Sequence, residues 1–268
     1  MITVTVKDET HDVVAIPRPP LIYLDHWALR CLSSNGSFRE KFIEFFKKYG
    51  TFLFSWTNVL EVAENSGTSL DAIQSFLTEI GEQWFPIEWN AFEVIRREKE
   101  FTLGNNNPCL ASGFLEAYYP HISDGPLSLS TVCDLTQDSE IKPACCQHLE
   151  YVKAETRKTL IYWRSEDPKS VDIPKYFDPD SPTIYVVERL RYLIQKESFK
   201  IEANDALDFL HAVVPIAYGD FVLLDKHWAD LARKLKLPSD RVKVYSPKHV
   251  EKFLENLERV ERSGWTMN

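Results

Sequence analysis

Two short apolar runs in this chain each end at an aspartate. Residues 21–24 are followed by Asp25, and residues 221–224 are followed by Asp225. Runs of this length and composition predict buried strands. In open α/β sheets, ligand sites lie beyond the carboxyl ends of the strands, at the point where the strand order reverses. If the two strands are neighbours, both aspartates point into one crevice.

Three more acids accompany them. Asp205 and Asp208 are three residues apart on a predicted helix, so they share one face. Glu61 lies in the first turn of a helix that follows a second strand, residues 51–56, and is again on the carboxyl side of the sheet. Carboxylates gathered at short range repel one another unless a cation is present, and hard oxygen ligands select Mg²⁺ or Mn²⁺ over zinc. The pattern therefore predicts a divalent metal site.

Each of these acids also has a purely structural interpretation. An aspartate after a strand is often the N-cap of the next helix, which would account for Asp25 and for Asp225 equally well. Glu61 in a first helical turn can complement the helix dipole, and Asp205 can cap or begin its own helix. Asp220, between a glycine and a strand, is typical of a turn. Only the combination of these acids at one edge of the sheet favours a metal-binding role over the structural one.

Alternating strands and helices should position these acids. The apolar spacing predicts helices from Ser37 to Gly50, from Thr57 onward, near 69–80 and 90–100, after Pro182, over 203–214, over 228–235 and after Pro247, with Pro215 ending or kinking its helix. A further strand is predicted at 241–245. The expected fold is α/β, with a mainly parallel twisted sheet covered by helices on both faces.

Length and composition favour one globular domain. The chain has 268 residues and a net charge of −9, and no apolar stretch reaches the ~18 residues that span a bilayer. We expect a single domain over 1–268, whose core comes from 20–100 and 183–258, with a mostly helical insertion at 101–182. No signal peptide is visible, and the five cysteines form no C-x-x-C pair, so we expect a cytoplasmic protein without disulfides.

The acidic motifs resemble those of the PIN-domain nucleases. The stretches that carry the resemblance are short, lie in the family's order and together span roughly 20–100 and 184–258: residues 22–25, 55–62, 208–212, 219–226 and 242–254. The resemblance implies a Mg²⁺- or Mn²⁺-dependent nuclease in which Asp25, Glu61, Asp208 and Asp225 hold metal. Asp205 competes with Asp208 for the third position, and the spacing to Asp225 favours Asp208.

Several further residues are candidates for contact with the substrate. His26 stands where the family commonly has a small polar residue, and it could contact a phosphate, whereas Thr57 matches a hydroxyl found before the helix with the glutamate. Lys153, Arg157 and Arg164 lie broadly on one face of a helix predicted near 147–165. Residues 147–200 as a whole contain ten basic and nine acidic residues. We expect these cations to contact the phosphates of single-stranded RNA, although solvated helix faces would look the same.

Three alternatives stay open. The chain could be a non-catalytic PIN-like scaffold that binds RNA or a protein partner, although it retains all four acids. The second alternative is a DNA nuclease of related fold. It is disfavoured because the sequence shows no evident helical arch or helix-hairpin-helix element. A HAD-type phosphatase would need an aspartate where Trp27 stands. Self-association is also open.

Overall fold

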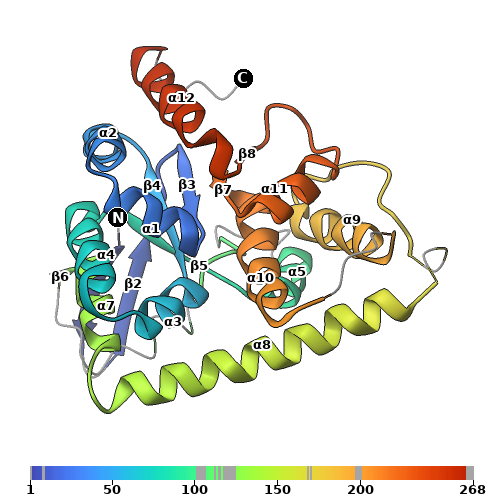
Figure 1. Ribbon diagram of the computed structural model, residues 1–268, viewed down its shortest axis with the longest axis horizontal. Helices are drawn as coiled ribbons and strands as arrows, with labels where there is room; N and C mark the ends of the chain where they lie inside the picture. Colours follow the sequence, from blue (N-terminus) through green and yellow to red (C-terminus); the bar gives the residue numbers. More distant parts are fainter. Residues whose placement is uncertain are drawn as a thin grey trace.

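A five-stranded parallel sheet forms the centre of the computed structural model (Figure 1). The structure describes residues 2–7, 10–100, 107–111, 113, 116, 125–167, 169, 171–196 and 201–263. The strand order is β5-β4-β3-β7-β8, and the strands are β3 (Leu21–Leu24), β4 (Thr51–Ser55), β5 (Trp84–Ile87), β7 (Phe221–Leu223) and β8 (Lys243–Tyr245). The predicted α/β class and parallel sheet are confirmed.

The strand order reverses at β3. From β3 the chain adds β4 and β5 on one side, and after a long excursion it adds β7 and β8 on the other. β3 and β7 are therefore neighbours, with Tyr23 opposite Val222, and the backbone N–H of Asp25 donates to the carbonyl of Leu223 at 3.1 Å. This is the topological switch point at which the two strand-ending aspartates were expected to meet.

Helices cover both faces of the sheet. One face packs on α1 (His26–Ser34), α2 (Gly36–Phe46), α4 (Gly67–Ile80) and α12 (Val250–Ser263). The other packs on α5 (Ala91–Glu100), α8 (Ile141–Ser165), α9 (Pro182–Lys196), α10 (Ala203–Tyr218) and α11 (Lys226–Arg233). Strand β3 shows the alternation, because Ile22 and Leu24 enter the first core and Tyr23 the second. Helix α3 (Trp56–Glu64) contributes to both.

The region between α5 and α9 is largely helical where the structure describes it. It contains α7 (Leu129–Thr136) and the 25-residue α8, which begins six residues before the helix predicted near 147–165. Figure 1 shows α8 lying along one side of the molecule, where it contacts α3, α9 and α10. Several residues of the predicted insertion, among them 101–106 and 117–124, lie outside the described residues.

The first fifteen residues contribute strands that we did not predict. β1 (Ile2–Lys7) pairs antiparallel with β2 (Thr10–Ala15) and with the short β6 (Gly125–Pro126), which makes a second, three-stranded sheet. The alternation of apolar and polar residues over 2–7 was the available signal.

Helix α10 differs from its predicted end. It continues through Pro215 to Tyr218, where proline was expected to stop or kink it. Proline removes one backbone donor. Val214, Ile216 and Ala217 are fully buried around it, and their burial offsets that loss. No described helix combines the length and apolarity needed to cross a membrane.

Two predicted helix starts also differ. Helix α2 is capped by the Asn35 side chain rather than by Ser37, and α3 by Ser55 rather than by Thr57. The side chain of Ser55, the last residue of β4, accepts from the backbone N–H of Asn58. The hydroxyl nearer the end of the strand therefore takes the capping position, and Thr57 lies inside the first turn.

Candidate acidic site

Asp25 and Asp225 both cap helices, as the structural interpretation predicted. Asp25 Oδ1 accepts from the backbone N–H of Ala28 at 3.0 Å, at the start of α1. Asp225 Oδ1 accepts from Trp228 at 2.7 Å, at the start of α11. Each cap uses one of two carboxylate oxygens. Capping therefore orients the two carboxylates and leaves the second oxygen of each for other work.

Asp25 and Asp208 respond to the neighbouring acids. Burial raises the pKa of Asp25 well above its ordinary value, and the charges of Glu61, Asp208 and Asp225 raise it further. Burial likewise raises the pKa of Asp208 to about 8, with added contributions from the charges of Asp225 and Glu61 and from a hydrogen bond to Asp225. The four acids therefore lie within electrostatic reach of one another, and Asp208 and Asp225 form a hydrogen-bonded carboxyl pair.

No basic side chain neutralises three of these acids. Within the described ranges, no Lys or Arg forms an ion pair with Asp25, Asp208 or Asp225, although Asp25 is only 4% exposed. Buried carboxylates without cationic partners are costly to ionise. The empty site therefore opposes ionisation of Asp25 and Asp208 until a cation arrives.

Glu61 has a different environment. Its Oε2 lies 2.7 Å from Nε2 of His211 and 3.9 Å from Nδ1 of His26. Burial raises the pKa of Glu61, but the nearby charge of His211, its hydrogen bond, His26 and Lys153 outweigh burial, and the net shift is downward. The two histidines and Lys153 therefore favour the ionised form of Glu61, whereas the surroundings of Asp25 and Asp208 oppose ionisation.

The histidine His211 was missed as a site residue by sequence reasoning. It is 1% exposed on α10 and lies three residues after Asp208, so the same helical spacing that paired Asp205 with Asp208 could have found it. Its other ring nitrogen, Nδ1, is hydrogen-bonded to the hydroxyl of Tyr23 on β3. Tyr23 was counted only as part of an apolar strand.

The remaining predicted residues lie around this centre. Asp205 Oδ2 accepts from the backbone N–H of Glu202 at 2.7 Å, so it serves the start of α10, and its charge also reaches Asp208. Thr57 is 1% exposed, and its hydroxyl lies 2.6 Å from Ser55 Oγ. Thr57 therefore supports the end of β4 from inside. His26 is partly exposed beside Glu61.

The three α8 cations have partners inside the protein. Lys153 lies 2.8 Å from Glu150 and 3.5 Å from Glu64, the last residue of α3. Arg157 contacts the carbonyl of Ile201 at 3.4 Å, and Arg164 donates to the carbonyl of Ile194 at 2.9 Å, near the end of α9. These contacts join α8 to its neighbours, and a phosphate-binding role for these residues stays a prediction.

The donor set suits a hard cation, but its arrangement is not yet that of a ligand cage. Among the residues that the structure describes, no group of three or more His, Cys, Asp or Glu side chains is placed to hold a metal ion. Carboxylate oxygens are the ligands that Mg²⁺ and Mn²⁺ prefer, and three of the four acids have no basic partner within the described part of the chain. The residues present fit such an ion in chemistry, and a bound cation would favour the ionised form of Asp208, whose pKa the empty site raises.

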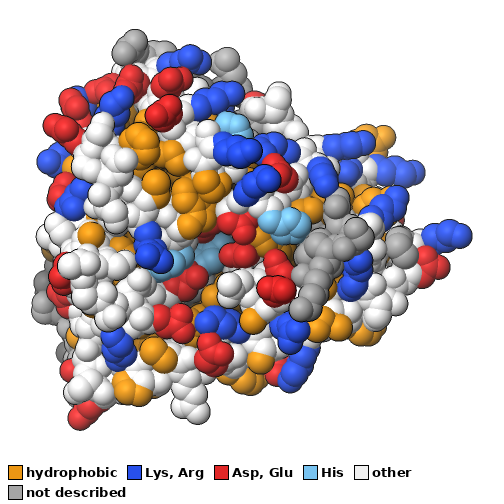
Figure 2. All heavy atoms as spheres, viewed as in Figure 1, with side chains coloured by type: hydrophobic (Ala, Val, Ile, Leu, Met, Phe, Trp, Pro, Cys, Tyr) orange, Lys and Arg blue, Asp and Glu red, His pale blue; other side chains and the backbone are white. Residues whose placement is uncertain are grey.

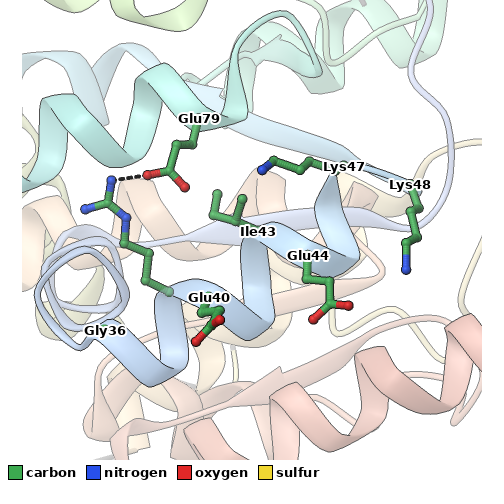
Figure 3. A pocket seen from close by; sticks show the side chains of 8 residues that line it. Gly36, Glu40, Ile43, Glu44, Lys47, Lys48 and Glu79 are labelled. Carbon is green, nitrogen blue, oxygen red and sulfur yellow. Dashed lines mark hydrogen bonds and ion pairs between the residues drawn. The ribbon is translucent and has the colours of Figure 1, made fainter.

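The acidic site is distinct from the groove between α2 and α4, which none of its four acids lines. Figure 2 shows acidic side chains beside histidines near the middle of one face, with Lys and Arg side chains on either side. A groove elsewhere, between α2 and α4, is lined by acids and bases together, with Arg39 bound to Glu79 across it (Figure 3). Lys48, which also lines this groove, is paired with Glu261, so acids and bases alternate there rather than gather as in the acidic site.

Comparison with protein-family models, with curated proteins and with solved structures found no match. The function must therefore be argued from the site itself.

Proposed function

We propose that this chain is a divalent-metal-dependent endoribonuclease that hydrolyses phosphodiester bonds at the acidic site. The observation that carries the proposal is the convergence of Asp25, Asp208 and Asp225 from three separate elements without a basic partner among the described residues. An arrangement that raises the pKa of its own carboxyls destabilises the empty protein, and a cation that binds them offsets this cost. The PIN-like order of the motifs supports the same conclusion.

The chain's own residues would divide the work. Asp25, Glu61, Asp208 and Asp225 would hold Mg²⁺ or Mn²⁺, which supplies Lewis-acid activation of water and neutralises charge on the phosphate. The helix caps hold the carboxylates of Asp25 and Asp225 in place, and α10 carries Asp208, whose pKa the charges of Asp225 and Glu61 raise after the larger effect of burial. The partly exposed His26 lies at the edge, where it can donate to a phosphate oxygen.

Two exposed basic residues, Arg30 and Lys226, are close in sequence to Asp25 and Asp225. Arg30 lies on α1, one turn after His26, whose pKa its charge lowers after the larger effect of burial. Lys226 directly follows Asp225 and is exposed at the start of α11. We assign both to phosphate contacts. With a net charge of −9, the protein would hold its substrate by a few local contacts rather than by a broad basic surface.

The decisive experiment is a cleavage assay on one unstructured RNA and on a DNA of the same sequence. Purified protein should cut the RNA with Mn²⁺ or Mg²⁺ and stop when EDTA is added. Asp208→Asn should abolish cleavage, whereas Asp230→Asn, an exposed acid on α11 that pairs with Arg233, should not. Cleavage that persists in EDTA overturns the metal mechanism, and cleavage of DNA alone overturns the substrate.

A non-catalytic scaffold that binds RNA or a protein is the second candidate. It is favoured by one observation, the lack of a three-ligand group among the described side chains. A scaffold would bind RNA equally well in EDTA and in Mn²⁺, and it would cut neither nucleic acid. A melting temperature that rises with Mn²⁺ would instead favour the nuclease.

A further inference from the structure

A chain of buried polar groups runs from the sheet to Glu61. The Tyr23 hydroxyl, on β3, is hydrogen-bonded to Nδ1 of His211, and Nε2 of His211 lies 2.7 Å from Oε2 of Glu61. Tyr23 is fully buried and His211 is 1% exposed. The members come from β3, α10 and α3, so the chain links three elements that meet at the acidic site.

The hydroxyl of Tyr23 is itself held from behind. Ser55 Oγ lies 3.2 Å from the Tyr23 hydroxyl, and its neighbours are Thr57 Oγ1 at 2.6 Å and Asn58 Oδ1 at 2.9 Å. The side-chain amide of Asn58 donates to the carbonyl of Leu24 at 3.1 Å. The phenol is therefore fixed by side chains that are anchored to the ends of β3 and β4.

When the ring of His211 is neutral, these contacts specify one of its two tautomers. A phenol that donates to Nδ1 leaves the ring proton on Nε2, and an N–H at Nε2 can donate to the Glu61 carboxylate. The reverse tautomer would place a bare nitrogen against an ionised carboxylate, which has no proton to offer. The hydrogen bond thus fixes one oxygen of Glu61, and no hydrogen bond within the described residues engages its Oε1.

We propose that His211, held in the Nε2–H tautomer by Tyr23, is the positioning residue that orients Glu61 toward the cation. This inference rests on the proposed function, because it concerns the same site. A free glutamate side chain loses rotational freedom when it binds a metal, and a hydrogen bond that already restricts it lowers that loss. The competing interpretation is a buried histidine that only fills the core between β3 and α10.

Three substitutions separate orientation from packing. His211→Leu removes the donor at similar volume, whereas His211→Gln keeps an amide N–H within reach of Glu61. Tyr23→Phe keeps the ring and removes only the hydroxyl that selects the tautomer. Tyr185→Phe is the matched control, because the buried hydroxyl of Tyr185 donates to the carbonyls of Leu235 and Lys236, which do not belong to the site.

The first measurement is Mn²⁺ affinity by calorimetry. We expect His211→Leu to weaken binding by roughly 10–100-fold, the usual effect of losing a group that orients a metal ligand. Tyr23→Phe should weaken it less, His211→Gln should recover most of it, and Tyr185→Phe should match wild type. In RNA cleavage, the same order should appear in kcat with KM nearly unchanged.

The second measurement needs no metal. Protein labelled with ¹⁵N-histidine in EDTA should give one imidazole in the Nε2–H tautomer whose signal disappears in His211→Gln and shifts in Tyr23→Phe. An Nδ1–H tautomer overturns the inference even if His211→Leu fails to fold. Wild type that binds Mn²⁺ and cuts RNA, with His211→Leu of equal affinity, overturns this inference alone. Wild type that binds no Mn²⁺ overturns it together with the proposed function.

Discussion

Strand β7 has an aspartate beside each of its ends, and the two have opposite surroundings. At the amino end, Asp220 Oδ2 accepts from the backbone N–H of Leu21 at 2.6 Å, and its own N–H donates to the carbonyl of Leu21 at 2.8 Å. At the carboxyl end, Asp225 caps α11 with Oδ1, and its charge raises the pKa of Asp208 after the larger effect of burial. Both ends belong to the same parallel sheet.

The difference shows how a structural acid can be told from a functional one. Burial raises the pKa of Asp220 to about 6, but its backbone hydrogen bond and the charges of Arg241 and Lys243 oppose that shift. Asp208 has neighbours of its own sign, and its pKa rises to about 8. The donor and the cations around Asp220 offset part of the cost of its burial, whereas the like charges around Asp208 add to that cost, so Asp208 requires another reason to be there.

The sharpest test of this contrast is Asp208→Asn. We expect RNA cleavage to fall roughly 100-fold or more, because a metal ligand contributes several kcal/mol to transition-state stabilisation. The melting temperature in EDTA should stay equal or rise, since the amide of asparagine cannot acquire the charge that the neighbouring acids oppose. Cleavage and melting are measured on the same preparation. A variant that melts earlier and keeps its activity would make Asp208 structural and move Asp205, one turn earlier, into the ligand set.

At the other end of the sheet, Asp220→Ala should do the reverse. It leaves the backbone N–H of Leu21 without its acceptor, which costs about 2 kcal/mol and lowers the melting temperature by roughly 4–8 °C. The stabilisation by Mn²⁺ should be unchanged. A loss of the Mn²⁺ effect in Asp220→Ala, measured by melting with and without the ion, would contradict the division between the two ends.

The pH dependence of stability should separate the same two acids. A carboxyl group whose folded pKa is raised binds its proton more tightly when folded, so stability falls as pH rises from the ordinary carboxyl pKa through the folded value. For Asp220 this window ends near pH 6, and for Asp208 near pH 8. In EDTA, the wild type should therefore lose a few degrees of melting temperature between pH 6 and 8, and Asp208→Asn should lose less. Equal slopes for both proteins would argue against the buried carboxyl pair.

The smallest effect is expected at the contact between α8 and α9. Arg164→Ala removes a donor from the carbonyl of Ile194 near the end of α9, which should cost about 1 kcal/mol, or roughly 2–4 °C. If the contact is only structural, RNA affinity is unchanged. Weaker binding with a flatter salt dependence would support the sequence-based prediction that Arg164 contacts phosphate.

Local patterns in the sequence were enough for the fold class and for part of the site. Hydrophobic runs and helical spacing predicted the strands and helices of the core, because each element carries its own periodicity. The rule for carboxyl ends of parallel strands then placed Asp25 and Asp225 at one edge, and the pairing of β3 with β7 confirms that these strands are neighbours. Their helix caps were also foreseen, since capping depends on residues only three apart.

The hydrogen-bond partners of Glu61 were decided by the tertiary structure alone. His211 is 150 residues from Glu61 and 188 from Tyr23, and no local pattern relates residues so distant. The same holds for the α8 cations, whose partners lie on α3, near the end of α9 and before α10. Spacing along the chain fixes which face of a helix a side chain occupies. Whether that face meets solvent, a like charge or a hydrogen-bond partner depends on which other element packs against it. The pKa and the orientation of the side chain follow from that packing, because burial and neighbouring charges set both.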